Sequence, residues 1–282
     1  MFWQKRPKSC VCFICKDEGK YLVELIAYYV ALGFDQVVVY DNGSSDESQR
    51  LLPALKARFG IELRPWIVSK NVSPQISAYE HAIRNCRAEW MLFVDADEFL
   101  VLHNHETINE FLEQFDSRRD VSLIGFNWRI FGDSFLDEND GRPVIERLTY
   151  ASLQDFSVNY HVKSIFRRRS QIGVVNMHAC ETKGQMVLPD GRDLTMTQNW
   201  GVITTVDFSV AQINHYYGKT WAEFRKKANR GQAGVPETDD QKYCYTKDYF
   251  NVHNRNECID ISAQKFLPQV KAAIHEIGSA LV

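Results

Sequence analysis

Three carboxylates follow an apolar run in the segment MLFVDADEFL. Asp95, Asp97 and Glu98 come directly after residues 91–94, which are all apolar. Like charges repel, and a buried carboxylate is costly unless a positive group pairs with it. Either the predicted strand ends in solvent here, or a cation is bound here. Hard oxygen ligands select Mg²⁺ or Mn²⁺, which take further ligands from water and phosphate. Asp95 and Asp97 are therefore candidate ligands of a divalent cation held with a diphosphate.

Two histidines offer a further ligand for such a cation. His215 lies in QINHYYG and His178 in VVNMHAC, and each follows an apolar run. A single histidine on a strand is more often a structural residue. A carboxylate pair with one imidazole is nevertheless a common Mn²⁺ ligand set. The sequence favours His215 as the third ligand and leaves His178 as the alternative.

Two other predicted strand ends also carry polar residues. The first strand ends in Lys16-Asp17-Glu18 and the second in Asp41-Asn42-Gly43. An aspartate in the position of Asp41 could accept hydrogen bonds from a ribose or a base. The run NGSSD that follows it is equally good turn and helix-cap chemistry. Turn chemistry could explain one acidic strand end, but it explains less well why three of them carry acids to the same edge.

The elements that would position these residues alternate between strand and helix over the first hundred residues. Strands alternating with amphipathic helices predict a mainly parallel sheet with helices on both faces, and ligands of such sheets bind beyond the carboxyl ends of the strands. Predicted strands cover 10–15, 36–40, 61–68 and 90–95, and predicted helices cover 18–33, 44–60 and 75–86.

The second half of the chain predicts more strands and two long loops. The loops cover about 133–160 and 182–208, and loops of this length are usually functional or mobile. The sequence predicts one domain with a helical appendage. Further strands are predicted over 122–132, 162–168, 172–181 and 211–218, a basic helix over 220–231 and a closing amphipathic helix over 263–277.

Composition narrows the function classes. The chain has 282 residues and a formal net charge of −3 with acids and bases mixed, which gives no electrostatic basis for binding nucleic acid. The short basic run 167–169 is predicted to be a solvated strand end. Seven scattered cysteines show no zinc spacing and predict free thiols in a reducing compartment. No apolar stretch reaches the length of a membrane span. We therefore expect a cytoplasmic protein.

Four segments occur in a fixed order from Cys12 to about Gly231 and together resemble a known family. They are KDEGKYLVELIAYYVALGFDQVVVYDNGSSDES, EWMLFVDADEFL, WRIFGDSF and NHYYGKTWAEFRKKANRG. Each motif is weak alone, but the ordered set resembles the glycosyltransferase family 2-like and family 92-like enzymes of the GT-A fold. The resemblance implies a Rossmann-like α/β fold with a mixed, mainly parallel central sheet flanked by helices. It implies a catalytic domain over 1–231, with a nucleotide-sugar half at about 8–100 and an acceptor half at about 101–231. A C-terminal helical extension over 232–282 would pack on the same domain.

The resemblance also implies roles for individual residues. Asp97 would bind Mn²⁺ or Mg²⁺, together with Asp95 and His215. Three positions depart from the family pattern: Asp17 stands where asparagine is common, residues 27–29 stand where a histidine often lies, and Phe135 replaces a frequent glycine. These departures bear on the acceptor more than on the donor. The implied nucleotide-sugar site consists of Lys16, Glu18, Asp41, Asn42, Asp95, Lys227 and Arg230.

The activity implied is transfer of a sugar, with inversion, from a nucleoside diphosphate sugar to a hydroxyl of a glycan or glycolipid. A UDP-sugar is the expected donor, and polysaccharide biosynthesis is the expected process. Negative charge grows on the departing diphosphate, and a divalent cation or basic residues such as Lys219 would neutralise it. Because the sequence predicts no membrane span, contact with a lipid-linked acceptor would be peripheral, at the inner face of the membrane.

Inverting transfer needs a carboxylate that removes the proton of the acceptor hydroxyl. We choose Asp133 as the candidate base because it directly follows the predicted strand WRIFG. Aromatic residues of the same region could stack on sugar rings, although they are more often core. Other candidate bases are Asp137, Glu138 and Glu146, and the aromatic candidates are Trp128, Phe131, Tyr216 and Tyr217.

Two other functions remain open on the sequence. A carbohydrate-binding or nucleotide-sugar-binding protein without transferase activity would need the same groups, although intact Asp95 and Asp97 argue against a decayed site. A sugar nucleotidyltransferase would usually carry a glycine-rich basic loop after its first strand, and FICKDEGKY holds only one glycine.

Overall fold

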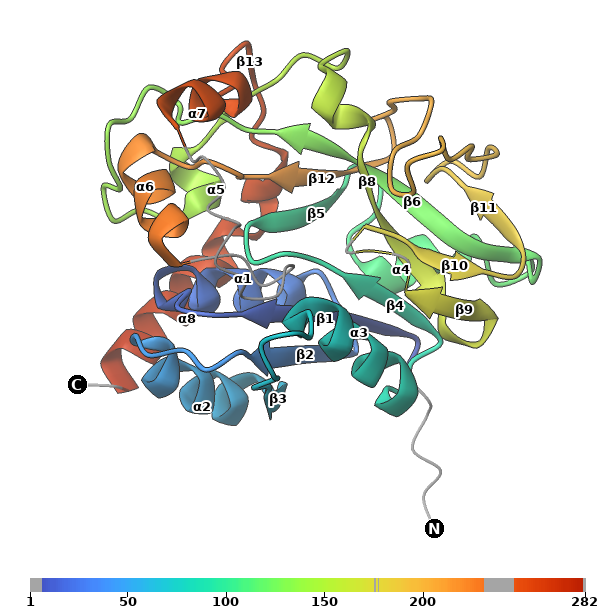
Figure 1. The fold of residues 1–282 in the computed structure, drawn as a ribbon, viewed down its shortest axis with the longest axis horizontal. Helices are drawn as coiled ribbons and strands as arrows, with labels where there is room; N and C mark the ends of the chain where they lie inside the picture. The colour runs from blue at the N-terminus through green and yellow to red at the C-terminus, as the bar shows by residue number, and fades with distance from the viewer. Residues whose placement is uncertain (1–6, 175, 177, 231–245, 281–282) are drawn as a thin grey trace.

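The computed structural model describes residues 7–174, 176, 178–230 and 246–280, and its centre is one large mixed sheet (Figure 1). The strand order is β3-β2-β1-β4-β8-β6-β12-β5, and β11 (Gln185–Val187) pairs with β6. The bounds are β1 Ser9–Cys15, β2 Gln36–Asp41, β3 Glu62–Pro65, β4 Trp90–Phe93, β5 Glu98–Leu102, β6 Val121–Ile130, β8 Val162–Arg167 and β12 Ala211–His215.

The strand directions bring several strand ends to one edge of this sheet. β1 is parallel to β2 and β4, and β2 is parallel to β3. β8 is antiparallel to both β4 and β6, so β6 runs in the same direction as β4. β12 is parallel to β6 and antiparallel to β5. The carboxyl ends of β1, β2, β4, β6 and β12 therefore meet at one edge, where ligands of α/β sheets bind.

Helices cover both faces of the parallel part of the sheet, which explains why all seven residues of β1 are buried. Alternate side chains of β1 enter different cores: Val11 and Phe13 pack towards α1 (Gly19–Ala31), and Cys10 and Cys12 pack towards α3 (Pro74–Asn85). α1, α2 (Ser48–Phe59) and α8 (Leu267–Ala280) lie together along one side (Figure 1). The predicted fold class, a mixed α/β fold of the GT-A type, is confirmed.

The C-terminal part that the structure describes packs on this layer. α8 buries Val270, Ala273 and Ile277 against the core that α1 shares with the sheet. Residues 232–245 of the predicted extension lie outside the described residues. Within the described part of the chain, no helix is both long enough and apolar enough to cross a membrane. The remaining elements are α4 Ile108–Glu113, α6 Trp221–Arg230, α7 Lys247–His253, β13 Cys258–Ile259, η2 Arg168–Ser170 and η3 Ser262–Phe266.

Several predicted elements differ from the structure. The helix predicted from residue 44 begins at Ser48, because residues 44–46 instead form a turn in which the Asp46 carboxylate accepts hydrogen bonds from the backbone of Gly19 and Ser48. The strand predicted over 172–181 is two strands, β9 (Gln171–Val174) and β10 (Cys180–Thr182), with His178 in the turn between them. The last of the three carboxylates, Glu98, begins β5, which the sequence analysis missed.

The long loops also contain short elements that were not predicted. The first contains α5 (Val144–Arg147), β7 (Tyr150–Ala151) and η1 (Ser157–Tyr160), and the second contains β11. The basic run 167–169 is only partly solvated. Arg167 is buried, lies over the ring of Trp90 at 4.2 Å and donates to the backbone carbonyls of Phe115 and Val121.

A buried glutamate of α1 holds α5 in place and makes stability depend on pH. Glu24 accepts hydrogen bonds from the backbone nitrogens of Val144 at 2.7 Å and Ile145 at 2.9 Å. Burial raises the pKa of Glu24 to about 7. The native state therefore binds a proton that the unfolded chain has already released above about pH 4.5, and the free energy of unfolding falls as pH rises through this range.

We expect the ionisation of Glu24 to lower the free energy of unfolding by up to about 3 kcal/mol between pH 4.5 and 7.5. Urea denaturation of wild type and Glu24→Gln across this range measures it. The variant, which cannot ionise at this position, should show a flatter dependence of unfolding free energy on pH. An equal slope in both proteins would contradict the assignment.

Candidate active site

The three acidic strand ends lie at the same edge of the sheet, as predicted. Cys15, the last residue of β1, pairs with Asp41 at the end of β2, and β4 ends next to β1 on its other side. The chain then passes from β4 to the start of β5, and Glu98 pairs with His215 at the end of β12. Asp95 and Asp97 thus lie in a short connection that crosses this edge of the sheet from β4 to the β5–β12 pair.

Asp95 is held by residues from two other elements. Its Oδ2 lies 2.9 Å from Nζ of Lys163, at the start of β8, and its Oδ1 accepts a hydrogen bond from Gln75 of α3 at 2.6 Å. Burial works against ionisation, but Lys163 overcomes it and lowers the pKa of Asp95. Lys163 is fully buried and also lies 3.3 Å from Glu98. Asp95 is therefore a fixed carboxylate with one partner on each oxygen.

Asp97 is the second fixed carboxylate, with an exposure of only 5 %. Its Oδ2 accepts a hydrogen bond from Nζ of Lys227 of α6 at 2.5 Å, and its Oδ1 lies 3.5 Å from Nε2 of His215. Burial opposes ionisation, but Lys227 and His215 together lower the pKa of Asp97 well below its usual range. This carboxylate is charged, buried and directed at an imidazole.

His215 lies beside Asp97, whereas His178 lies against Trp128. Nε2 of His215 faces the Asp97 carboxylate, and Nδ1 is buried without a hydrogen-bond partner. Burial lowers the pKa of His215, so the ring is neutral at neutral pH. Burial lowers the pKa of His178 to about 3. The Trp128 ring touches both histidines, with centroid distances of 4.3 Å to His215 and 5.0 Å to His178. The indole nitrogen of Trp128 and Nδ1 of His178 also lack a partner.

The side-chain atoms of this group are of the kinds that bind a divalent cation. A neutral imidazole with an unpartnered nitrogen beside a charged carboxylate is the ligand pair that Mn²⁺ accepts. Asp97 and His215 would hold the ion, with Asp95 near them. Among the described residues, no group of three histidine, cysteine, aspartate or glutamate side chains is placed to hold a metal ion. Remaining ligands would therefore come from water and a bound phosphate, as is usual for Mg²⁺.

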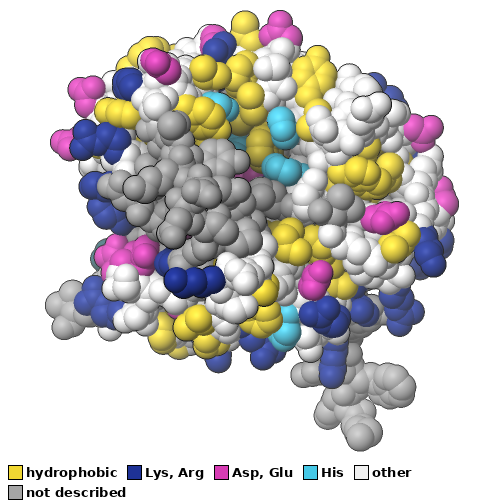
Figure 2. Space-filling view, in the orientation of Figure 1, with side chains coloured by type: hydrophobic (Ala, Val, Ile, Leu, Met, Phe, Trp, Pro, Cys, Tyr) yellow, Lys and Arg dark blue, Asp and Glu magenta, His cyan; other side chains and the backbone are white. Residues whose placement is uncertain are grey.

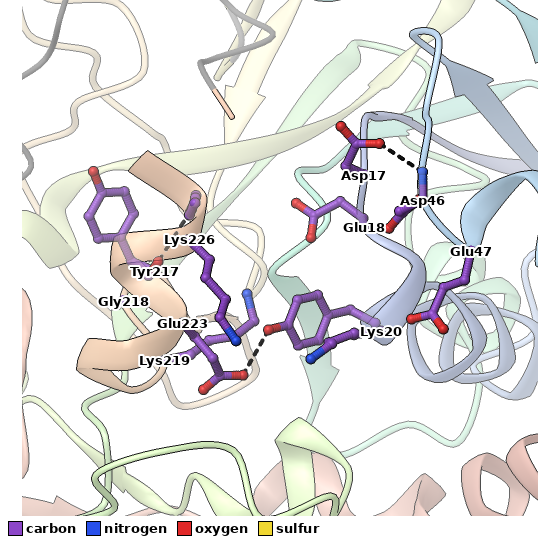
Figure 3. A pocket seen from close by; sticks show the side chains of 12 residues that line it. Asp17, Glu18, Lys20, Asp46, Glu47, Tyr217, Gly218, Lys219, Glu223 and Lys226 are labelled. Carbon is purple, nitrogen blue, oxygen red and sulfur yellow. Dashed lines mark hydrogen bonds between the residues drawn. The ribbon is translucent and has the colours of Figure 1, made fainter. Parts of the chain in front are cut away.

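Lys227 is one of the residues that line a cavity of about 450 Å³. Figure 3 shows side chains that surround this cavity. Four acidic residues that precede α1 and α2, together with Lys20 of α1, line one part of it. Lysines of α6 and of the turn before it, together with Glu223, line another part. Tyr21 joins these two parts by donating a hydrogen bond to Glu223 at 2.8 Å. The cavity is lined by Asp17, Glu18, Lys20, Tyr21, Asp46, Glu47, Tyr217, Gly218, Lys219, Glu223, Lys226 and Lys227.

Of the predicted nucleotide-sugar residues, Glu18 and Lys227 line this cavity, and Asp95 lies nearby in the acidic connection. Lys16 and Asn42 follow the ends of β1 and β2 at the same edge of the sheet. The Asp41 carboxylate accepts a hydrogen bond from the backbone of Ser44 at 3.0 Å, so it also supports the turn before α2. The side chain of Arg230 lies outside the described residues.

Asp133, the candidate base, lies beyond the end of β6 in a different network. Its carboxylate accepts hydrogen bonds from Asn254 at 2.8 Å, from Asn256 at 3.0 Å and from the backbone of Phe135 at 2.9 Å. The structure therefore surrounds this carboxylate with amide donors rather than with Asp95 or Asp97. Its role as base stays a prediction.

Sequence reasoning missed two residues that shape the site. Lys163 stands in the apolar strand VKSIF and Gln75 near the start of α3, and together they fix both oxygens of Asp95. A lysine among apolar residues was the available signal for Lys163, because a buried lysine requires a carboxylate partner. No feature of the sequence around Gln75 indicates that it belongs to the site.

The site and its sheet define a class of protein: a mixed α/β protein with acidic residues at the carboxyl edge of its sheet. A family model for glycosyltransferase family 92 matches residues 8–251. The chain belongs to glycosyltransferase family 92.

Plant relatives support this membership. A glycosyltransferase family 92 protein of Ricinus communis is 23% identical over 239 residues, which is 80% of this chain and 38% of that protein. One from Arabidopsis thaliana is 24% identical over 231 residues, again 80% of this chain and 38% of the relative. One from Oryza sativa subsp. japonica is 27% identical over 138 residues, which is 47% of this chain and 23% of that protein. The chain thus spans less than two fifths of the length of these relatives.

Solved structures show more distant similarity. Residues 1–349 of TarS from S. aureus align with a TM-score of 0.41 and 12% identity, covering 95% of this chain and 72% of that one. Glucosyl-3-phosphoglycerate synthase from Mycobacterium tuberculosis, crystallised with Mn²⁺, UDP and glucosyl-3-phosphoglycerate, aligns with a TM-score of 0.36 and 13% identity. That alignment covers 58% of each chain.

Proposed function

We propose that this protein is a metal-dependent glycosyltransferase that uses a nucleoside diphosphate sugar as donor. The observation that carries the proposal is the pair of Asp97 and His215, buried together at the carboxyl edge of the sheet with Lys227 on the other carboxylate oxygen. A cation held by this pair would lie next to the cavity wall that carries Lys219 and Lys227, and these lysines suit a diphosphate. Membership of glycosyltransferase family 92 agrees with it.

The positively and negatively charged groups of the site would have different roles in the reaction. A bound Mn²⁺ or Mg²⁺ would neutralise the negative charge that grows on the departing diphosphate. Lys219 and Lys227 on the cavity wall would share that role, because fixed positive charges in a partly buried site stabilise developing charge more than water does. Asp95, held by Lys163 and Gln75, would accept hydrogen bonds from the donor and fix its orientation.

The other parts of the reaction stay predictions. Inversion requires a base, for which Asp133 is the candidate. A UDP-sugar donor, a glycan or glycolipid acceptor, a cytoplasmic location and peripheral contact with a membrane are likewise predictions. The main alternative is a sugar-binding protein that holds the same ligands without transferring a sugar.

A thermal-shift screen of UDP-, GDP-, CMP- and dTDP-sugars with and without Mn²⁺ tests the proposal. A donor present at 100 times its dissociation constant should add about 2.7 kcal/mol to the free energy of unfolding. For a chain of this length that raises the midpoint by about 5 °C or more. We expect one nucleotide class to give a shift that depends on Mn²⁺.

Hydrolysis of the same donor in the absence of acceptor separates an enzyme from a binding protein. A transferase should release nucleoside diphosphate slowly and only with Mn²⁺ present. Stabilisation by oligosaccharides alone, with no response to any donor, would contradict the proposed function and favour a carbohydrate-binding protein.

A further inference from the structure

A strained turn follows β6 and presents an aromatic side chain to solvent. Ser134 has φ 52° and Phe135 has φ 62°, so two successive residues with Cβ atoms occupy the left-handed region. This conformation costs free energy in any residue other than glycine, and it persists only where surrounding contacts impose it. Phe135 is nevertheless 72% exposed. Neither the strain nor the exposure contributes to folding.

Polar contacts fix this turn in one conformation. The backbone nitrogen of Ser134 donates to Oδ1 of Asn256 at 2.9 Å. The hydroxyl of Ser134 accepts hydrogen bonds from the backbone nitrogens of Thr149 at 2.7 Å and Tyr150 at 3.0 Å. Asp133, just before it, is bound by two asparagine side chains. The ring of Phe135 is therefore presented by a rigid turn.

A second, half-buried aromatic residue lies against Phe135. The rings of Phe135 and Tyr150 meet edge to face, with centroids 5.1 Å apart. Tyr150 belongs to β7 and pairs with Ile259 of β13, which is 65% exposed. We name Phe135 and Tyr150 the aromatic platform. Rigid aromatic rings lose little conformational entropy on binding, which suits them as contact surfaces.

The platform is tied to the strands that carry the site. The backbone nitrogen of Phe131 donates to the carbonyl of His215 at 3.1 Å. Phe135 follows Phe131 by four residues, so their Cα atoms lie at most ~14 Å apart. The platform is thus joined to the strand of His215 but does not belong to the group around Asp97. A ligand that reached both would have to be extended.

The charges beside the platform favour one kind of ligand. Asp137 and Glu138 follow Phe135 and are exposed. Carboxylates repel anionic lipid head groups and acidic sugars, whereas they accept hydrogen bonds from uncharged hydroxyls. The C–H face of a sugar ring stacks on aromatic side chains. An exposed aromatic ring followed within three residues by two exposed carboxylates is therefore suited to a neutral sugar and unsuited to a membrane surface.

Building on the proposed function, we propose that the aromatic platform binds an uncharged sugar of an oligosaccharide acceptor, at a position removed from the hydroxyl that receives the new sugar. Phe135 is the residue that stacks, and the strained turn holds its ring in place before the acceptor arrives. The acceptor is accordingly a chain of neutral sugars rather than a single sugar.

The test is Phe135→Gly, compared with wild type on an array of neutral oligosaccharides from monosaccharides to hexasaccharides. Glycine relieves the left-handed strain, so the thermal midpoint should be unchanged or higher by about 2 °C. Binding of the longer oligosaccharides should weaken about tenfold, while that of monosaccharides should not change. Donor-induced shifts and donor hydrolysis should be those of wild type.

Two controls isolate the ring. Phe135→Tyr keeps an aromatic face and should bind oligosaccharides as wild type does. Ile172→Ala removes an exposed apolar side chain from β9, in a separate two-stranded sheet, and should also leave binding unchanged. These variants show whether the aromatic ring, rather than exposed apolar surface in general, carries the effect.

The outcomes are distinguishable from failure of the proposed function. If wild type shows no response to any donor, the proposed function is wrong. If donor responses are normal but Phe135→Gly binds all oligosaccharides like wild type, or wild type binds none of them, the platform proposal is overturned. Binding of wild type to phosphatidylcholine vesicles that is lost in Phe135→Gly would also overturn it and indicate a lipid surface.

Discussion

Asp97→Asn is expected to lower donor hydrolysis about 100-fold or more and to remove the dependence of donor binding on Mn²⁺. Asparagine keeps the shape of the side chain and removes its charge. The carboxylate is 5% exposed, and its two oxygens face His215 and Lys227. Without that charge, a cation would keep only a neutral imidazole and a neutral amide as protein ligands, which hold Mn²⁺ far more weakly.

Two measurements check this prediction. Titration calorimetry with Mn²⁺ in the presence of the nucleotide reports the affinity for the metal, and release of nucleoside diphosphate reports turnover. Asp116→Asn is the matched control, because it makes the same chemical change in an exposed ion pair with Lys8. Equal Mn²⁺ affinity in Asp97→Asn and wild type would show that the cation does not bind at this carboxylate.

Lys163→Met is expected to lower the free energy of unfolding by about 2–3 kcal/mol at neutral pH. Lys163 is fully buried between Asp95 and Glu98. Burial raises the pKa of Glu98 to about 8, so this carboxyl keeps its proton at pH 7, and the charge of Lys163 is balanced by Asp95. Methionine fills the space but leaves Asp95 charged without its partner. The side chain of Asp95 is 28% exposed, which keeps the loss below that of a fully buried charge.

A double-mutant cycle with Asp95→Asn separates charge from packing. If the lost pairing causes the instability, Lys163→Met combined with Asp95→Asn should be more stable than Lys163→Met alone. Urea denaturation of the four proteins gives the coupling energy. Lys8→Met, which breaks an exposed ion pair, should cost less than about 1 kcal/mol. A double variant no more stable than Lys163→Met would assign the effect to packing instead.

The sequence predicted the regular first half of the fold well, because local patterns control it. β1, β2 and β4 are short apolar runs separated by amphipathic helices, and each pattern is complete within a few residues. The second half was predicted less well. β5 begins at Glu98, inside the acidic segment, and the turn that holds His178 interrupts an apolar run that reads as one strand.

The candidate site likewise has a part that could be predicted from the sequence and a part that could not. The spacing of Asp95 and Asp97 after an apolar strand, and the acidic ends of the neighbouring strands, could be read from the sequence because parallel strands bring their carboxyl ends to one edge. His215 was predicted beside them, but the pairing of Lys163 and Gln75 with Asp95 and of Lys227 with Asp97 could not be read from the sequence. Lys163, Lys227 and His215 are separated from Asp97 by 66 to 130 residues, and no local pattern predicts which distant side chain meets which oxygen.

By itself, then, the sequence determined the fold class, the edge of the sheet that carries the site and the carboxylates that lie there. Only the tertiary structure decided that His215 rather than His178 lies beside Asp97, that Lys163 pairs with Asp95, and that Asp133 lies among asparagines. The apolar pattern of a strand predicts only whether each of its residues is buried. Charge pairing and backbone strain depend on which distant segments pack together, and the strained turn at Phe135 is visible only in the folded backbone.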